Sequence, residues 1–262
     1  MWNGGNGGGC CLEQNRGERT MREHPLICAD SVVRNILSGA QTQDRRPVTT
    51  GTCNYNGAPA SKKVWACLRF GEGELRREPA GPGTCLSVPL SPPYGDEGVR
   101  YRVRPRIEAG DLLYCRETLR RADDDPCGEP IVTYAADGAA AMDLWTPIRW
   151  PWERPVRPSI HMDRLFARLW LRVEWVRLER LQSISDDDCL AEGIDPETNE
   201  DWAAAEHYQA GGSPIQGGSP ERFAFVALWD GLYAKRGMGW DANPWVVACG
   251  FSVASRTGRA GV

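Results

Sequence analysis

The chain of 262 residues has 41% hydrophobic and 25% charged residues, the balance of a globular protein with enough apolar material for one core. Its formal net charge of −4 argues against a protein that coats DNA by bulk electrostatics, because such domains are strongly basic. No stretch approaches the roughly 18 consecutive apolar residues that a membrane span needs, so we expect no membrane association.

Ten cysteines are scattered along the chain without a C-x-x-C pair, and residues 1–20 hold no apolar segment typical of an export signal. We therefore expect reduced, mostly buried thiols. A zinc site built from Cys53, Cys67 and Cys85 is an alternative, but the paired spacing typical of zinc ligands is missing. The sequence predicts no metal site and no cofactor.

The first predicted elements form a strand and a helix. Residues 1–20 are rich in Gly and Asn, so we predict a disordered extension there and a single domain over 21–262. Residues 25–29 are predicted as a strand. Asp30 or Ser31 is then expected to cap a helix with apolar residues at helical spacing, and Gly39 is expected to end it. The helix delivers the chain into a polar segment, 40–46.

Residues 49–108 are rich in Gly, Pro, Ser and Arg, which predicts an irregular insertion with a few short strands. Strands are predicted at 112–117, 131–135 and 169–176, the last from its period-2 alternation. Ser185 and Asp188 resemble a capping box for a short helix that stops at Gly193.

Ser219 and Pro220 predict the start of a longer helix that ends at Gly237. Its apolar stripe is expected to consist of Phe225, Leu228, Trp229 and Leu232. A final strand is predicted at 247–253. The mixture of strands and a few helices indicates an α+β fold, which suits a small, strongly bent barrel better than a doubly wound sheet.

Five segments, in order, resemble phage ASCH-domain proteins, a PUA-like family. Residues 26–46 are similar to the family's opening, with its R-x-I-L-x-G-x-K-T-Q-T-R-R, and 110–118 to its G-D-x-L-W-V-R-E-T. Residues 157–164 are similar to R-P-S-I-H-M-P-R, 181–194 to L-Q-x-I-S…A-x-x-E-G-I, and 237–246 to G-x-G-W-D-x-N-P-W-V. The match runs from about residue 26 to 254, and the insertion matches poorly.

The resemblance implies a PUA-like (ASCH) small β-barrel with flanking helices and a long irregular insertion at about 49–108. It also implies RNA or a modified nucleoside as the partner, in the cytoplasm of a bacterial host. Some small ASCH proteins are amidohydrolases that remove an acetyl group from N-acetylcytidine, and others have been proposed as ribonucleases. The oligomeric state is not indicated by the sequence.

One hypothesis for the site is that of a hydrolase. The amidohydrolase pattern uses a Lys and a Thr of the K-T-x-T segment and a later Glu, since a hydroxyl nucleophile needs a neighbouring base. In this chain the Lys position is Gln41, which does not titrate, and the second Thr position is Asp44. Asp44 and Glu192 remain as a candidate carboxylate pair for another hydrolysis.

The preferred hypothesis is that the protein is a binding module. Arg45 and Arg46 are candidates for pairing with phosphate, and Gln41 and Thr42 for bonding a base edge. Aromatic residues are candidates for stacking on bases. The further candidate binding residues, all in matching segments, are Glu117, His161 and Trp240, and additional stacking candidates are Tyr114, Trp145 and Trp150.

Ordinary structural roles compete with each assignment. The arginine pair could be solvated at a helix end, the tryptophans could be core anchors, and a lone histidine is more often structural than catalytic. A phage structural or morphogenesis factor with a vestigial cleft is the third hypothesis. All functional readings share one geometric expectation: segment 40–46 and Glu192, far apart in sequence, line one pocket.

Overall fold

The structure is a computed structural model that describes residues 21–49, 53–56, 74–77, 84–89, 100–124, 130–141, 154–195 and 218–258. The predicted extension 1–20 and the stacking candidates Trp145 and Trp150 lie outside these residues. The part of the chain that is described has an α+β fold with mixed sheets, which confirms the α+β class of the prediction.

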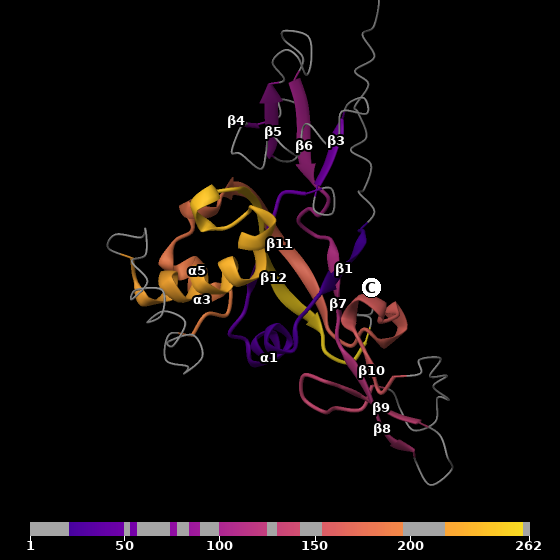
Figure 1. Cartoon of the computed structure of the whole chain (residues 1–262). Helices are drawn as coiled ribbons and strands as arrows, with labels where there is room; N and C mark the ends of the chain where they lie inside the picture. Colours follow the sequence, from indigo (N-terminus) through magenta and orange to yellow (C-terminus); the bar gives the residue numbers. More distant parts are fainter. Residues whose placement is uncertain are drawn as a thin grey trace, which may run out of the picture.

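A five-stranded sheet forms the centre of the molecule (Figure 1). Its order is β1-β7-β11-β12-β2, with β1 parallel to β7 and the other pairs antiparallel. The strands span Glu23–Ile27 (β1), Gln43–Pro47 (β2), Leu112–Arg116 (β7), Trp170–Arg180 (β11) and Trp245–Ser255 (β12). The two long strands β11 and β12 pair with each other in the middle of the sheet. β7 pairs with the other edge of β11, and β2 pairs with the other edge of β12.

The expected closed β-barrel is not found among the described strands. The sheet has two edges, β1 and β2, which are not paired with each other through their backbones. Side chains span the gap instead: Arg46 Nη2 of β2 donates a hydrogen bond of 3.0 Å to the carbonyl of Ile27 at the end of β1. The sheet is therefore bent so that its edges face one another, with an open seam between them.

Helix α1 (Asp30–Ser38) packs Val33 and Ile36 into the core of the central sheet. Gly39 takes a left-handed conformation (φ 84°) and ends the helix as predicted. The predicted cap is wrong: Asp30 is already the first helical residue, and Ala29 occupies the cap position without a side-chain bond. The chain turns directly from α1 into β2, which places the polar segment beside the sheet.

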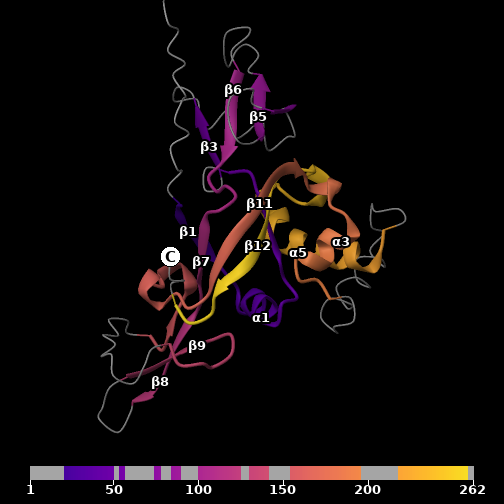
Figure 2. The same ribbon diagram turned by 180° about the vertical axis from the view of Figure 1, so that it is seen from behind.

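Two further helices lie beside strands β11 and β12, as the view from behind shows (Figure 2). The Oγ of Ser185 accepts from the N–H of Asp188 at the start of α3 (Asp186–Ala191), and Ser219 caps α5 (Pro220–Tyr233) in the same way. Both predicted starts are confirmed. Short 3₁₀ turns complete this region: η3 (Leu181–Ser183), η4 (Ala234–Arg236) and η5 (Trp240–Ala242).

The predicted apolar stripe of α5 is partly wrong. Phe225 and Trp229 are buried, but Leu228 and Leu232 are 49% and 55% exposed. The buried face instead includes Phe223, Ala224 and Val226. Since almost every residue from 223 to 229 is apolar, helical spacing alone did not identify which face would meet the core.

Two smaller sheets extend the molecule at its two ends (Figure 1). One is β10-β8-β9, with a buried cluster around Trp170 and the turns η1 and η2 beside it. The other, β3-β6-β5-β4, lies within the predicted insertion and is antiparallel throughout. The bounds are Cys53–Asn56 (β3), Glu74–Arg77 (β4), Thr84–Pro89 (β5), Arg100–Pro105 (β6), Leu119–Asp124 (β8), Pro130–Tyr134 (β9), Val156–Arg157 (β10), Ser159–His161 (η1) and Arg164–Phe166 (η2).

None of the helices in the described ranges combines the length and the apolar character that crossing a bilayer would require.

Candidate functional site

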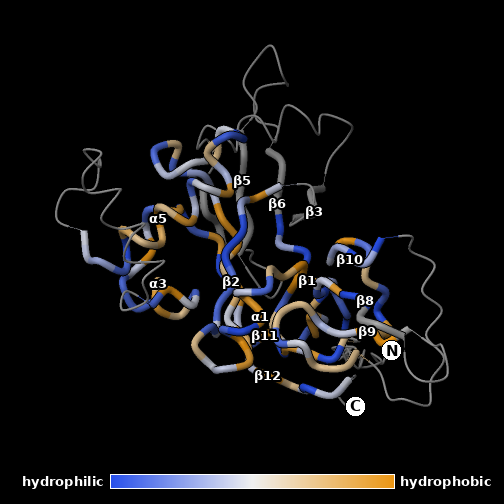
Figure 3. Tube along the Cα trace, turned by 60° about the horizontal axis from the view of Figure 1, so that its bottom comes forward, coloured by the Kyte–Doolittle hydropathy of each residue, from blue (hydrophilic) through white to orange (hydrophobic). Residues whose placement is uncertain are grey.

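Strand β2 divides the polar segment between two faces of the sheet. It is a hydrophilic strand beside the apolar core strands (Figure 3). Neighbouring side chains of a strand point to opposite faces, so Gln43 and Arg45 lie on one side while Asp44 and Arg46 lie on the other. The two sides have different surroundings: α3 and the end of β11 on the Arg45 side, and the open seam on the Asp44 side.

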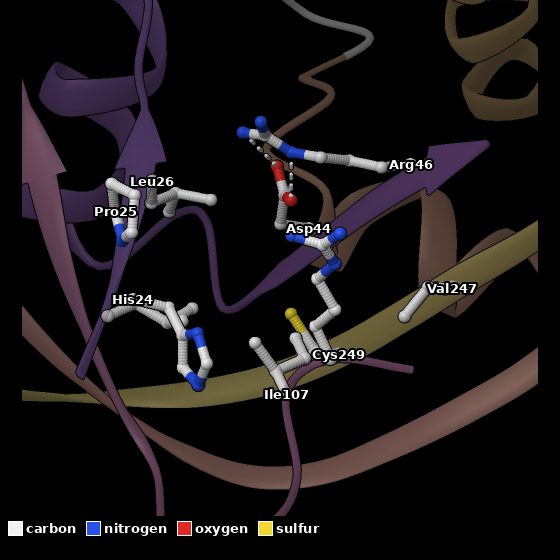
Figure 4. A pocket seen from close by; sticks show the side chains of 10 residues that line it. His24, Pro25, Leu26, Asp44, Arg46, Ile107, Val247 and Cys249 are labelled. Atoms are coloured by element: carbon white, nitrogen blue, oxygen red, sulfur yellow. Dashed lines mark hydrogen bonds and ion pairs between the residues drawn. The ribbon is translucent and has the colours of Figure 1, made fainter. Parts of the chain in front are cut away.

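A cavity of about 200 Å³ occupies the seam between β1 and β2 (Figure 4). Its floor is apolar and its polar groups come from both edges and from the segment before β7. The lining residues are His24, Pro25, Leu26, Asp44, Arg46, Arg106, Ile107, Leu113, Val247 and Cys249.

Two polar residues of the cavity, Asp44 and Arg46, are held by a contact with each other. Arg46 Nε donates to Asp44 Oδ2 at 2.7 Å, and the same guanidinium reaches the carbonyl of Ile27. The charge of Asp44 is the main reason why the pKa of Arg46 lies above its ordinary value. His24 Nε2 lies 3.3 Å from Oδ2 of the buried Asp111. The cavity therefore presents a carboxylate, two guanidinium groups and an imidazole to a ligand.

The floor of the cavity is chemically inert. Burial raises the pKa of the Cys249 thiol well above its ordinary value, so it stays protonated and unreactive. Leu113 and Val247 beside it are 2% and 4% exposed. A flat ring placed on this floor would meet an apolar surface, and its edge would meet the polar groups of the rim.

On the opposite face of β2, Arg45 is the centre of a buried ionic cluster. Its guanidinium is inaccessible to solvent and bonds Glu179 at 2.5 Å, Glu192 at 2.7 Å and Asp188 at 3.3 Å. Arg177 adds a second cation, with Nη2 3.0 Å from Asp188 Oδ1. The guanidinium of Arg45, a candidate for phosphate in the sequence, is thus buried and bonded to three carboxylates in the structure.

Glu192 is the most perturbed carboxyl of this cluster. Burial raises its pKa to about 8, and the charges of Asp44 and Asp188 add to this, while Arg45 acts in the opposite direction. Gln41 pairs with Glu192 through an antiparallel β-bridge, and the N–H of Thr42 donates to the carbonyl of Ala191 at 2.9 Å. These backbone contacts join the segment after α1 to the end of α3.

Segment 40–46 and Glu192 thus meet through their backbones, and Glu192 does not line the cavity between β1 and β2. Asp44 and Arg46 line the cavity, whereas Glu192 is not among its lining residues. Gln41 is 5% exposed, and its Oε1 lacks a hydrogen-bond partner. Gly193 has a left-handed φ of 84°, which favours glycine, and a Cβ on it would lie 3.1 Å from Gln41 Cβ. Thr42 is exposed.

Three other predicted binding residues lie elsewhere. Glu117 is fully buried, and its carboxylate is held by Arg168 through bonds of 2.7 and 3.0 Å. Trp240 is 5% exposed and packs in the cluster with α5, so it is a core residue and has no exposed ring for stacking. His161 is an exposed residue of η1. None of the three lines the cavity.

Sequence reasoning missed His24 and Arg106 as cavity residues. Nothing in the sequence around His24 marks it, since it is one polar residue in a short strand. The split between Asp44 and Arg45 did have a signal, because adjacent strand residues face opposite ways. Among the described residues no group of three or more His, Cys, Asp or Glu is placed to hold a metal ion. The zinc alternative falls partly outside them, at Cys67.

No protein-family model matches the chain, and no curated protein matches it. Among solved structures, the crystal structure of protein EF3133 from Enterococcus faecalis V583, of the family DUF984, is similar to it. The match covers 94% of this chain and 88% of that chain, at 10% sequence identity and a TM-score of 0.32. A likeness of this degree carries no conclusion about fold or function.

Proposed function

We propose that the protein is an ASCH-like, phage-type binding module that holds a nucleoside, free or within RNA, in the cavity between β1 and β2. The observation that carries this proposal is the composition of the cavity: an ion pair, a second guanidinium and an imidazole surround an apolar floor. The five segments that resemble ASCH proteins support the same partner.

The chemistry of a base fits this arrangement. A carboxylate such as Asp44 accepts from an exocyclic amine, as carboxylates do with cytosine N4, while Arg46 donates to a ring carbonyl. The ring plane would rest on Leu113, Val247 and Cys249, because single-stranded RNA is recognised by packing unstacked bases and bonding their edges. Arg106 and His24 would then meet the ribose or its phosphate.

Titration calorimetry with the four ribonucleoside 5′-monophosphates and N-acetylcytidine tests the proposal. We expect at least one to bind with a Kd below about 1 mM, and Asp44→Asn to weaken that binding at least tenfold, because an amide accepts less strongly and adds donors. Asp163→Asn is the matched control, since this carboxylate is exposed and pairs with Arg157 away from the cavity. Equal affinities for both variants, or no binding at all, would contradict the proposal.

A hydrolase is the second candidate, favoured by the carboxyl of Glu192 with its pKa of about 8, a value suited to general acid–base catalysis. Its bond to Arg45 and its place outside the cavity make it the weaker one. The double variant Gln41→Lys, Asp44→Thr restores the residue types of the amidohydrolase pattern. Release of acetate from N-acetylcytidine by this variant would favour a latent hydrolase, and no release would leave the binding proposal in place.

A further inference from the structure

His24 lines the cavity from the β1 side, and its two ring nitrogens have different surroundings (Figure 4). Nε2 is buried and lies 3.3 Å from Oδ2 of Asp111, close enough for a hydrogen bond but not aligned for one. Polar contacts in functional sites are often poorly aligned before a ligand binds and tighten afterwards. Because 24% of the side chain is exposed while Nε2 is not, Nδ1 is the nitrogen that a ligand in the cavity can reach.

The buried carboxylate of Asp111 decides which nitrogen of His24 carries a proton. Asp111 is 1% exposed, and it accepts hydrogen bonds from the backbone N–H groups of Arg22 at 3.2 Å and Glu108 at 3.0 Å. A carboxylate offers only acceptors, so a proton on Nε2 of the imidazole is attracted to it and a lone pair there is repelled. In the neutral ring Nδ1 is then left as an acceptor. The cavity therefore meets a hydrogen-bond acceptor on its β1 side.

We propose that His24, positioned by Asp111, accepts a hydrogen bond from a ribose hydroxyl and makes the cavity selective for ribonucleosides over deoxyribonucleosides. This inference rests on the proposed function and adds a sugar preference to it. With the base edge at Asp44 and Arg46 on β2, the sugar lies toward β1, the strand of His24. A hydroxyl can donate to Nδ1, whereas the oxygens of a phosphate are acceptors. The 2′-hydroxyl is also the group by which proteins distinguish RNA from DNA.

Titration calorimetry of the full chain with cytidine, cytidine 5′-monophosphate and the 2′-deoxy and 3′-deoxy forms of this nucleotide tests the inference. The measurement is made at pH 8.5, because imidazole groups change charge between about pH 5 and 8. We expect one of the two deoxy forms to bind about fivefold more weakly than cytidine 5′-monophosphate, the factor that one hydrogen bond of ordinary strength contributes. The two arms identify which hydroxyl is bound. His24→Phe keeps a flat ring but has no acceptor, so it should remove this preference.

The matched control is His161→Phe, at an exposed position of η1 that does not line the cavity, and it should leave the preference unchanged. A measurement on the wild type does not depend on how any variant folds: two-bond ¹H–¹⁵N correlations show which ring nitrogen carries the proton. The chain has three histidines, and the signal that His24→Phe lacks is that of His24. We expect the proton on Nε2.

Three results overturn the inference while the cavity proposal stands. The first is a proton on Nδ1 of His24 at pH 8.5. The second is equal binding of cytidine 5′-monophosphate and both of its deoxy forms. The third is a His24→Phe variant that binds cytidine normally but the 5′-monophosphate more weakly, because His24 would then contact the phosphate. No binding of any of the four compounds contradicts both proposals.

Discussion

At the scale of single residues, Arg45 is a buried cation that holds parts of the structure together. Its side chain has no solvent contact, and three carboxylates surround it. Removing one partner of such a cluster leaves charges in a medium that does not solvate them. Arg177 contacts two of these carboxylates, Glu179 and Asp188, but its side chain is 46% exposed, so water can solvate part of their charge when it is removed.

The two arginines should therefore differ in their effect on stability. Arg45→Met should lower the free energy of unfolding by about 3–5 kcal/mol, because Glu179 and Asp188 lose their buried cation and Glu192 loses its hydrogen-bond donor. Arg177→Met should cost about 1 kcal/mol or less, as exposed pairs do. Urea unfolding at neutral pH measures both. Similar losses for the two variants would mean that Arg45 is not the centre of the cluster.

Glu192 makes stability depend on pH. Its pKa of about 8 in the folded state exceeds its ordinary value of 4.5, so the folded state holds a proton that the unfolded state has released. The resulting stability is complete below about pH 4.5 and is lost as the pH rises through 8. Between these values the slope reaches about −1.4 kcal/mol per pH unit. Burial raises the pKa of Glu117 as well, which adds a slope of the same sign.

Glu192→Gln should flatten this dependence without abolishing it. The amide cannot titrate, and its oxygen can still accept from Arg45. The free energy of unfolding at pH 5, 6, 7 and 8 gives the comparison. If the wild type and the variant fall in parallel over this range, the proton is not held by Glu192.

At the scale of elements, local signals in the sequence identified most helices and strands. Gly39, Ser185 and Ser219 marked helix ends correctly, because caps act through bonds to the nearest turn. The face of α5 was misjudged because its apolar residues are nearly continuous. Which of them meets the sheet depends on packing against η5 and β12, and helical spacing does not contain that information.

Strand β11 shows a second kind of limit. Its alternation predicts one buried face through Trp175, but a register shift between Val173 and Trp175 changes the facing residues. Beyond the shift Leu178 is buried and Trp175 is only half-buried. The indole of Trp175 lies across Gly250 of β12, where a Cβ would come within 2.2 Å of the ring.

Gly250→Ala should therefore destabilise the protein by about 1–3 kcal/mol, the range for an overpacked site, since the ring of Trp175 must move. Gly231→Ala is the control: nothing lies within 4 Å of its Cβ position and it is inside α5, so the helix should gain up to about 1 kcal/mol. Thermal unfolding of the two variants should shift Tm in opposite directions. If Gly250→Ala leaves Tm unchanged, the packing of Trp175 does not require a residue without a side chain at position 250.

At the scale of the whole molecule, the sequence predicted the α+β class correctly, but it also predicted a closed barrel, which the described strands do not form. The seam between β1 and β2 depends on the long-range pairing of strands, which no local pattern encodes. The same holds for the site: the meeting of Gln41 with Glu192 was expected from the resemblance, whereas the entry of His24 and Arg106 into the cavity follows only from the three-dimensional arrangement.

The central claim is that the cavity in this seam binds a base. Backbone amide chemical shifts of the ¹⁵N-labelled protein, followed during titration with cytidine 5′-monophosphate, test it most directly. The account predicts saturable shifts concentrated at Leu26, Asp44, Arg46, Ile107 and Cys249, which line the cavity. Shifts confined to the face of Arg45 and Glu192, or no saturable shifts at all, would contradict it.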